Sequence, residues 1–297
     1  MLNRPPISLA LVLAATFSLT ACGAKDGASS PGTGSADSAS STGSADARAA
    51  LEHIHGLGVD PKSHVLYVAT HHGLFQAAAG QVKVQRVGTS QQDIMGFSVI
   101  GPQRFLGSGH PAAGQNGPPN LGLIQSEDGG KRWRTISLLG AADFHVLRSS
   151  GRYVYGFDSS SGALMVSSDG GRGWVRRTAP AAMFDLAISP SDPLRVVIST
   201  ERGLFASITQ GKSWRALRSD TAGLLAWPER AGLVLVDGQG QVSRSADAGR
   251  TFKPVGSISG QPAALVGDGQ DLYAALADGS VLRSTNGGAD WAVRATA

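Results

Sequence analysis

The sequence predicts an all-β fold, a six-bladed β-propeller that comes after a leader and a low-complexity linker. Three observations support this prediction: a motif that recurs roughly every 40 residues, an abundance of glycine, and short apolar runs of strand-like composition between the copies of the motif. The chain has 297 residues, of which 40 are glycine, 41% are hydrophobic and 16% are charged. Few charges and many glycines are typical of folds with many tight turns and disfavour a helical bundle.

The first 21 residues have the composition of a secretory leader. Arg4 is followed by an apolar run over 7–19, which is too short to cross a bilayer as a mature helix. Residues 19–22, Leu-Thr-Ala-Cys, resemble the lipobox of bacterial lipoproteins, in which the cysteine becomes the lipidated N-terminus. The alternative is an ordinary signal peptide with an incidental cysteine.

This resemblance implies that Cys22, the only cysteine, attaches the mature protein to a membrane. We therefore expect an extracytoplasmic protein that is anchored by lipid to the cell membrane or to the outer membrane. A single cysteine also excludes an internal disulfide framework. Residues 22–52 are predicted to be the lipidated cysteine and a flexible tether, because they are rich in glycine, serine and alanine and poor in apolar side chains.

The motif that defines the repeat has the pattern Ser-x-Asp-x-Gly-x-x-Trp. Its five copies begin at Ser126, Ser167, Ser207, Ser245 and Ser284, with spacings of 41, 40, 38 and 39 residues. Each copy is predicted to form a turn in which Asp or Asn accepts backbone N–H groups, glycine adopts positive φ, and the aromatic ring packs beneath. The structural positions of the motif are Asp128, Trp133, Asp169, Trp174, Trp214, Asp247, Asn286 and Trp291.

The pattern resembles the Asp-box, or BNR, repeat of sialidases and other secreted β-propellers, which is informative about fold rather than activity. A first unit lacks the motif but has the same strand-like runs. The six units cover 53–88, 94–138, 142–178, 183–218, 222–256 and 261–294. Four strands per unit at this period are typical of a β-propeller, which we assign to residues 53–297.

All seven histidines lie between residues 53 and 145, and six of them are predicted on one face. In a propeller, the loops that link blades and the loops between second and third strands open on the same face. This face is predicted to carry candidate metal ligands from blades one to three: His53, His55, His71, His72, Asp93, Met95, His110, Asp143 and His145. His64 is the exception, because it falls in a turn between first and second strands.

The candidate ligands predict a site for a transition metal or an anionic ligand. Imidazole and carboxylate groups suit zinc or copper, and the thioether of Met95 favours copper. Strand alternation places His53 on the same side as His55, and Asp143 on the same side as His145. The alternative is that the histidines only bond to backbone groups around a polar channel.

Glycoside hydrolysis is one competing function. Its two carboxylates would come from Asp93, Asp143 and Asp185, and Asp185 is predicted to repeat the strand position of the other two. Sialidase activity is disfavoured, because all four tyrosines fall inside predicted strands and few arginines map to the histidine face. A scaffold that binds other proteins is the second competing function.

Residues 53–297 resemble bacterial secreted or lipid-anchored propellers whose first blades are rich in histidine. The resemblance rests on the segments 53–60, 71–75, 93–97, 109–111 and 143–145. Such proteins are commonly labelled sialidase-like or glycosyl hydrolases. Asp-box photosystem-assembly factors, which bind proteins, are a second similar group. The sequence has no run of basic residues that would indicate nucleic-acid binding. We expect a monomer whose partners are a membrane and a small ligand, a glycan or a protein.

Overall fold

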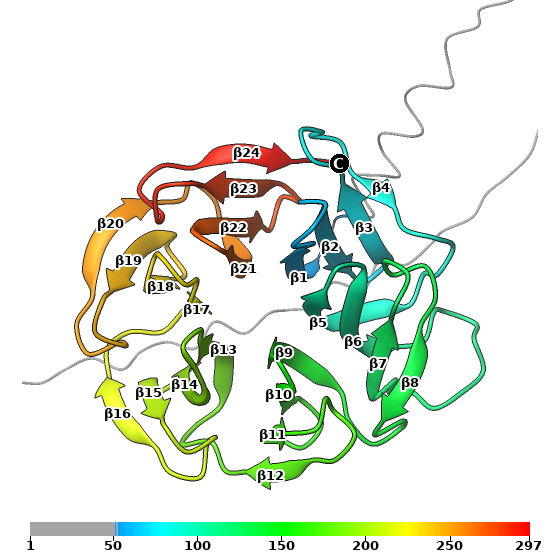
Figure 1. The fold of residues 1–297 in the computed structure, drawn as a ribbon, viewed down its shortest axis with the longest axis horizontal. Helices are drawn as coiled ribbons and strands as arrows, with labels where there is room; N and C mark the ends of the chain where they lie inside the picture. The colour runs from blue at the N-terminus through cyan, green and yellow to red at the C-terminus, as the bar shows by residue number, and fades with distance from the viewer. Residues whose placement is uncertain (1–50, 52) are drawn as a thin grey trace, which may run out of the picture. The chain divides into compact units, whose positions relative to one another are not determined.

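The computed structural model describes residue 51 and residues 53–297, and it confirms the predicted all-β fold with six blades. The described strands form six antiparallel sheets of four consecutive strands each (Figure 1). The leader over 1–21, Cys22 and the tether other than Leu51 lie outside the described residues. In the described part of the chain, no helix is long and apolar enough to cross a membrane.

Each blade is a meander whose strands follow the order of the chain. Blades one and two contain β1 (Ile54–Val59), β2 (Leu66–Thr70), β3 (Gly73–Ala77), β4 (Gln85–Arg86), β5 (Asp93–Gly101), β6 (Arg104–His110), β7 (Leu123–Ser126) and β8 (Arg134–Ser137). Blades three and four contain β9 (Phe144–Ser150), β10 (Tyr153–Asp158), β11 (Ala163–Ser167), β12 (Val175–Arg177), β13 (Met183–Ser189), β14 (Asp192–Thr200), β15 (Gly203–Ser207) and β16 (Arg215–Arg218). Blades five and six contain β17 (Leu224–Ala226), β18 (Leu233–Val236), β19 (Gln241–Ser245), β20 (Lys253–Ser257), β21 (Pro262–Asp268), β22 (Asp271–Leu276), β23 (Val281–Ser284) and β24 (Ala292–Ala295).

The core is divided among the interfaces between blades. Six clusters of buried hydrophobic residues each combine side chains from two neighbouring blades. The aromatic residue that ends each motif packs against the cluster shared with the preceding blade; these residues are Trp133, Trp174, Trp214, Phe252 and Trp291. The motif therefore closes a turn and also fills an interface between blades.

The hydrogen bonds of one motif show why its residue types recur. Ser167 Oγ accepts the N–H of Gly171 at 2.9 Å, and Asp169 Oδ1 accepts the N–H of Gly173 at 2.9 Å. Trp174 Nε1 donates to the carbonyl oxygen of Gly171 at 3.0 Å. The serine–glycine bond is present in all five copies, at 2.7 to 2.9 Å. The serine–glycine contact satisfies a buried N–H group that would otherwise lack a partner.

The first blade lacks the motif, and the end of the chain contacts it instead. Figure 1 shows the C-terminus beside β3 and β4. Thr296 donates its N–H to Val82 at 2.9 Å and accepts the N–H of Val84 at 3.1 Å. Leu51 is only 1% exposed and belongs to the hydrophobic cluster shared by blades one and six. The packed chain therefore starts before residue 53, the boundary predicted from the sequence.

A β-bulge recurs at one place in the innermost strand of five blades. The extra residue is His55, Met95, His145, Phe184 or Ala263 in β1, β5, β9, β13 and β21, respectively. The described pairing of β17 with β18 has no such shift. Because a bulge adds a residue to one strand only, the alternation expected from the sequence is interrupted where three candidate ligands lie.

Candidate metal centre

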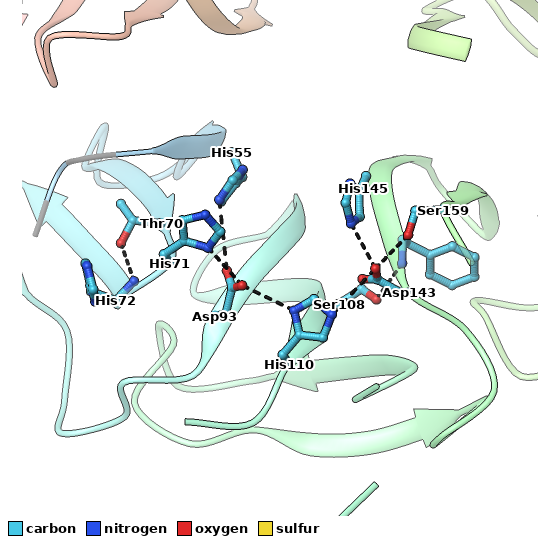
Figure 2. A network of polar contacts seen from close by, with 11 residues as sticks. His55, Thr70, His71, His72, Asp93, Ser108, His110, Asp143, His145 and Ser159 are labelled. Carbon is cyan, nitrogen blue, oxygen red and sulfur yellow. Dashed lines mark hydrogen bonds and ion pairs between the residues drawn. The ribbon is translucent and has the colours of Figure 1, made fainter. Parts of the chain in front are cut away.

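Four histidines and two aspartates from blades one to three form one polar network (Figure 2). They are His55, His71, Asp93, His110, Asp143 and His145. Each lies next to the start of a first strand or next to the end of a second strand. These ends meet at the same side of the blades, so the propeller topology brings together residues that lie up to 90 positions apart.

The most compact part of the network consists of His55, His71 and Asp93. One ligand atom from each lies within 4.8 Å of the other two. His71 Nδ1 is 2.9 Å from Asp93 Oδ2, and His55 Nε2 is 4.0 Å from Asp93 Oδ1. Both His55 Nε2 and Asp93 Oδ1 are buried and have no hydrogen-bond partner within the described chain. Unpartnered buried polar atoms cost about 1–3 kcal/mol each, so this arrangement requires an explanation.

The charge state of His55 suits metal coordination. Burial, together with the neighbouring charge of His71, lowers the pKa of His55 to about 4. The ring of His55 is therefore neutral near pH 7. A neutral imidazole has a nitrogen lone pair, which is the form that binds a metal ion.

His110 connects this group to a second carboxylate. Its Nδ1 is 3.2 Å from Asp93 Oδ2, and its Nε2 is 3.6 Å from Asp143 Oδ2. On the other side, His145 Nε2 is 2.8 Å from the same Asp143 oxygen. The network is thus continuous from blade one to blade three, with imidazole rings and carboxylates alternating (Figure 2).

Asp143 and His145 form the better-paired half of the network. Burial raises the pKa of Asp143, but hydrogen bonds from His145 and Ser159 outweigh burial and hold this pKa below its ordinary value. The hydrogen bond to Asp143 raises the pKa of His145. The pair therefore favours a carboxylate beside a protonated imidazole.

A turn built by Thr70 holds His71 at the end of β2. Thr70 Oγ1 donates to the carbonyl oxygen of Gly73 at 3.1 Å and accepts the N–H of His72 at 3.0 Å. Thr200 and Gly203 make the same contact in blade four, at 2.7 Å, where no histidine is present. The turn therefore does not need histidine, so turn geometry alone does not explain the presence of His71.

The two aspartates are fixed by their backbone surroundings. Gly109 has φ +145°, and a Cβ at this position would lie 2.1 Å from the carbonyl oxygen of Asp93. Only glycine allows β6 to approach Asp93 this closely, and this approach sets His110 beside the carboxylate. Asp143 donates its N–H to Asp158 Oδ1 at 3.0 Å. Both carboxylates are therefore pre-positioned by the fold.

Three of the nine candidate ligands are not drawn into the same contacts. His53 is exposed, with positive φ, and its ring lies 5.2 Å from the ring of His71. His72 is exposed, and Figure 2 shows its ring turned away from Asp93. Met95 is buried at the bulge of β5, and within the described residues no hydrogen bond joins its sulfur to the network.

The predicted equivalence of Asp185 with the two site aspartates is wrong. Asp93 and Asp143 lie two residues before the bulge of their strands, whereas Asp185 directly follows the bulged residue Phe184. Asp185 is buried and accepts a hydrogen bond from Arg148 Nη2 at 2.8 Å. The repeat spacing predicts the strand but not the position of the bulge. Relative to the bulge, Asp185 lies three residues later than Asp93 and Asp143, so its side chain has different surroundings.

The candidate carboxylates are not arranged as the acid of a glycoside hydrolase. A catalytic acid needs a carboxyl group whose pKa is raised, so that it holds its proton near neutral pH. The pKa of Asp143 is shifted in the opposite direction. Burial raises the pKa of Asp185, but this carboxyl group is already occupied by Arg148 and by the backbone N–H groups of Leu186 and Leu225.

Comparison with known proteins supports the fold alone. No family model matches the chain, and no curated protein matches it. The GH74 xyloglucanase from Xanthomonas campestris is 17% identical with a TM-score of 0.55, and the match covers 82% of this chain and 45% of that one. YCF48 bound to D1 peptide is 17% identical with a TM-score of 0.53, and 82% of each chain is covered. A chain of the nidogen/laminin complex is 15% identical with a TM-score of 0.60, and the match covers 76% of this chain and 91% of that one.

The chain spans less than half the length of the xyloglucanase. The three similar structures include an enzyme and two proteins in complexes with a peptide or another protein. At identities of 15 to 17%, their different activities do not transfer with the fold. What the comparisons establish is that the chain is a β-propeller protein.

Proposed function

We propose that this propeller binds a divalent transition-metal ion, zinc or copper, through His55, His71 and Asp93. Two observations carry the proposal: the three residues each bring one ligand atom within 4.8 Å of the others, and His55 Nε2 and Asp93 Oδ1 are buried without a partner. A cation between His55 Nε2 and Asp93 Oδ1 would satisfy both atoms at once. Two imidazoles and one carboxylate form a donor set that suits either metal.

The distances support coordination after a small movement. Tetrahedral ligands at about 2.0–2.2 Å from one zinc ion lie about 3.3–3.6 Å from each other, and His55 Nε2 and Asp93 Oδ1, which are 4.0 Å apart, would move slightly closer. His71 Nδ1 now contacts Asp93 Oδ2, so this contact would be exchanged for the metal. Coordination by His71 would release any proton that the nitrogen carries. His110, which contacts Asp93 Oδ2, would orient the carboxylate from outside the coordination shell.

The metal proposal is tested by calorimetric titration of chelator-treated protein with Zn²⁺ and with Cu²⁺. We expect His55→Ala and Asp93→Asn to weaken binding of the preferred ion by at least about tenfold, because each removes a ligand. His72→Ala is the matched control, since this neighbouring histidine is exposed and points away from the site. Equal affinity of wild type and His55→Ala, or no binding of either ion to wild type, would contradict the proposal.

We also propose that the protein acts outside the cytoplasm while anchored through Cys22. The proposal is supported by the lipobox-like residues 19–22, which precede a tether poor in apolar side chains. Metabolic labelling with a fatty acid should mark the wild-type protein, and Cys22→Ser should abolish the label and move the protein to the soluble fraction. Ser18→Ala, in the same leader, should change neither result. A Cys22→Ser protein that stays on the membrane would rule out this anchor.

A further inference from the structure

We propose that the groove between blades four and five binds an acidic peptide segment of a partner protein. The groove is a cavity of about 480 Å³, and its lining includes Arg195, Arg215 and Arg250. Within the described chain, none of these three guanidinium groups forms an ion pair or a hydrogen bond. The cavity is distinct from the candidate metal centre, because it lies at the opposite ends of the strands.

An equivalent groove lies two blades earlier and has arginine at the three equivalent positions. A cavity of about 750 Å³ between blades two and three is lined by Arg104, Arg134 and Arg172, and also by Arg152 and Asp169. Arg104 and Arg195 each precede the residue that pairs with the motif serine of their blade. Arg134 and Arg215 each follow the motif tryptophan. Arg172 and Arg250 each follow the glycine that donates its N–H to the motif serine in the next blade. The equivalent positions of the other interfaces do not hold three basic residues; between blades three and four they hold Tyr153, Val175 and Lys212.

The groove between blades two and three contains acidic side chains that the other groove lacks: Asp169 lines it, and Glu127 contacts one of its arginines. In blade two, Glu127 follows the motif serine, and its Oε1 is 3.3 Å from Arg134 Nη2. Gln125 Oε1 accepts a further hydrogen bond from the same nitrogen at 2.6 Å. In blade four, Ile208 and Ala206 occupy the positions equivalent to Glu127 and Gln125. Arg215 therefore lacks the intramolecular carboxylate that Arg134 has.

An external carboxylate would give Arg215 the partner that Glu127 gives to Arg134. Guanidinium groups bind carboxylates through charge-assisted hydrogen bonds, and three of them together favour a ligand with more than one acidic group. The same groove is lined by the apolar side chains of Val197, Ala206 and Ile208. Ile208 is 62% exposed, the highest value among the large hydrophobic residues of the described chain. A peptide that carries an apolar residue between acidic ones would contact both kinds of surface, whereas phosphate or sulfate would leave the apolar part uncovered.

The test is fluorescence anisotropy of a labelled peptide with alternating glutamate and leucine residues, with chelator-treated protein so that metal binding has no effect. Arg215→Ala should weaken binding by about tenfold, which corresponds to the loss of one charge-assisted contact. Ile208→Glu should weaken binding similarly, because the new carboxylate would pair with Arg215 as Glu127 pairs with Arg134. Val175→Glu is the matched control at another exposed apolar position, and it should bind as wild type does.

The reverse exchange gives an independent arm. Glu127→Ile combined with Gln125→Ala removes both side-chain acceptors of Arg134 and should raise the number of peptides bound per chain from one to two. A peptide with serine in place of leucine should bind more weakly to wild type. Unchanged binding by both Arg215→Ala and Ile208→Glu would overturn the proposal. Equally tight binding of the serine peptide, of inorganic phosphate or of anionic lipid vesicles would also overturn it, because the groove would then be an unspecific anion site.

Discussion

Replacing Asp185 with alanine is expected to lower the free energy of unfolding by about 3–5 kcal/mol, as for other buried ion pairs that lose one partner. Asp185 is 2% exposed on β13 and accepts three hydrogen bonds. One comes from Arg148 in blade three, and another comes from the backbone of Leu225 in blade five. Its loss would leave a guanidinium group and two N–H groups without their acceptor at the centre of three blades. Equilibrium unfolding in guanidinium chloride measures the change.

The matched control for this prediction is Asp220→Ala. Asp220 is 68% exposed and also pairs with an arginine, with 3.0 Å between its Oδ2 and Arg218 Nη2. Because water screens this pair, its loss should destabilise the protein far less than the loss of Asp185 does. Similar destabilisation by the two substitutions would mean that Asp185 does not link the blades in the way that we infer.

Acidification of the metal-free protein from pH 7 to pH 4 should destabilise wild type by about 3 kcal/mol more than it destabilises His55→Gln. Burial and the charge of His71 lower the pKa of His55 to about 4, whereas an unfolded chain protonates histidine near pH 6.5. Between these two values the unfolded state binds more protons than the folded state. Stability contributed by neutral His55 is therefore lost as the pH falls through this window. Guanidinium chloride unfolding at several pH values gives the difference.

His145 provides a control of opposite sign. The hydrogen bond that His145 donates to Asp143 raises the pKa of His145, so the stability from this contact is fully present at low pH and is lost as the pH rises through the folded-state pKa. His145→Gln should therefore destabilise the protein more at acidic pH than at alkaline pH. A wild-type pH profile that parallels that of His55→Gln would show that the burial of His55 is not coupled to protonation.

The fold was predictable because its signal is periodic and local. The motif serines, glycines and aromatic residues recur at a nearly constant spacing, and each copy needs only neighbouring residues to close its turn. Five such turns define blades two to six, and the length of the remaining chain accommodates one more. The way the first and last blades meet was not predictable, since it depends on Thr296 pairing with Val82 and Val84, more than 200 residues away.

The candidate site was only partly predictable. The clustering of histidines on three blades follows from strand order, and strand order follows from the repeat. The register of each side chain does not, because a bulge requires no particular residue type; His55, Met95 and Phe184 occupy the same bulge. For the same reason Asp185 was assigned to the wrong position. The arginine grooves escaped sequence analysis because each draws its three arginines from three separate segments of two blades.

The recurring bulge makes one face of the propeller modular. The bulge position holds four types of side chain in five blades, and the pairing of the strands resumes after each of them: His55, Met95, His145, Phe184 and Ala263. The backbone therefore tolerates imidazole, thioether, phenyl or methyl groups there without a change in its hydrogen-bond ladder. A single substitution at a bulge can therefore change which side chain a blade presents on this face while the backbone stays the same. Evolution or protein design can use five such positions.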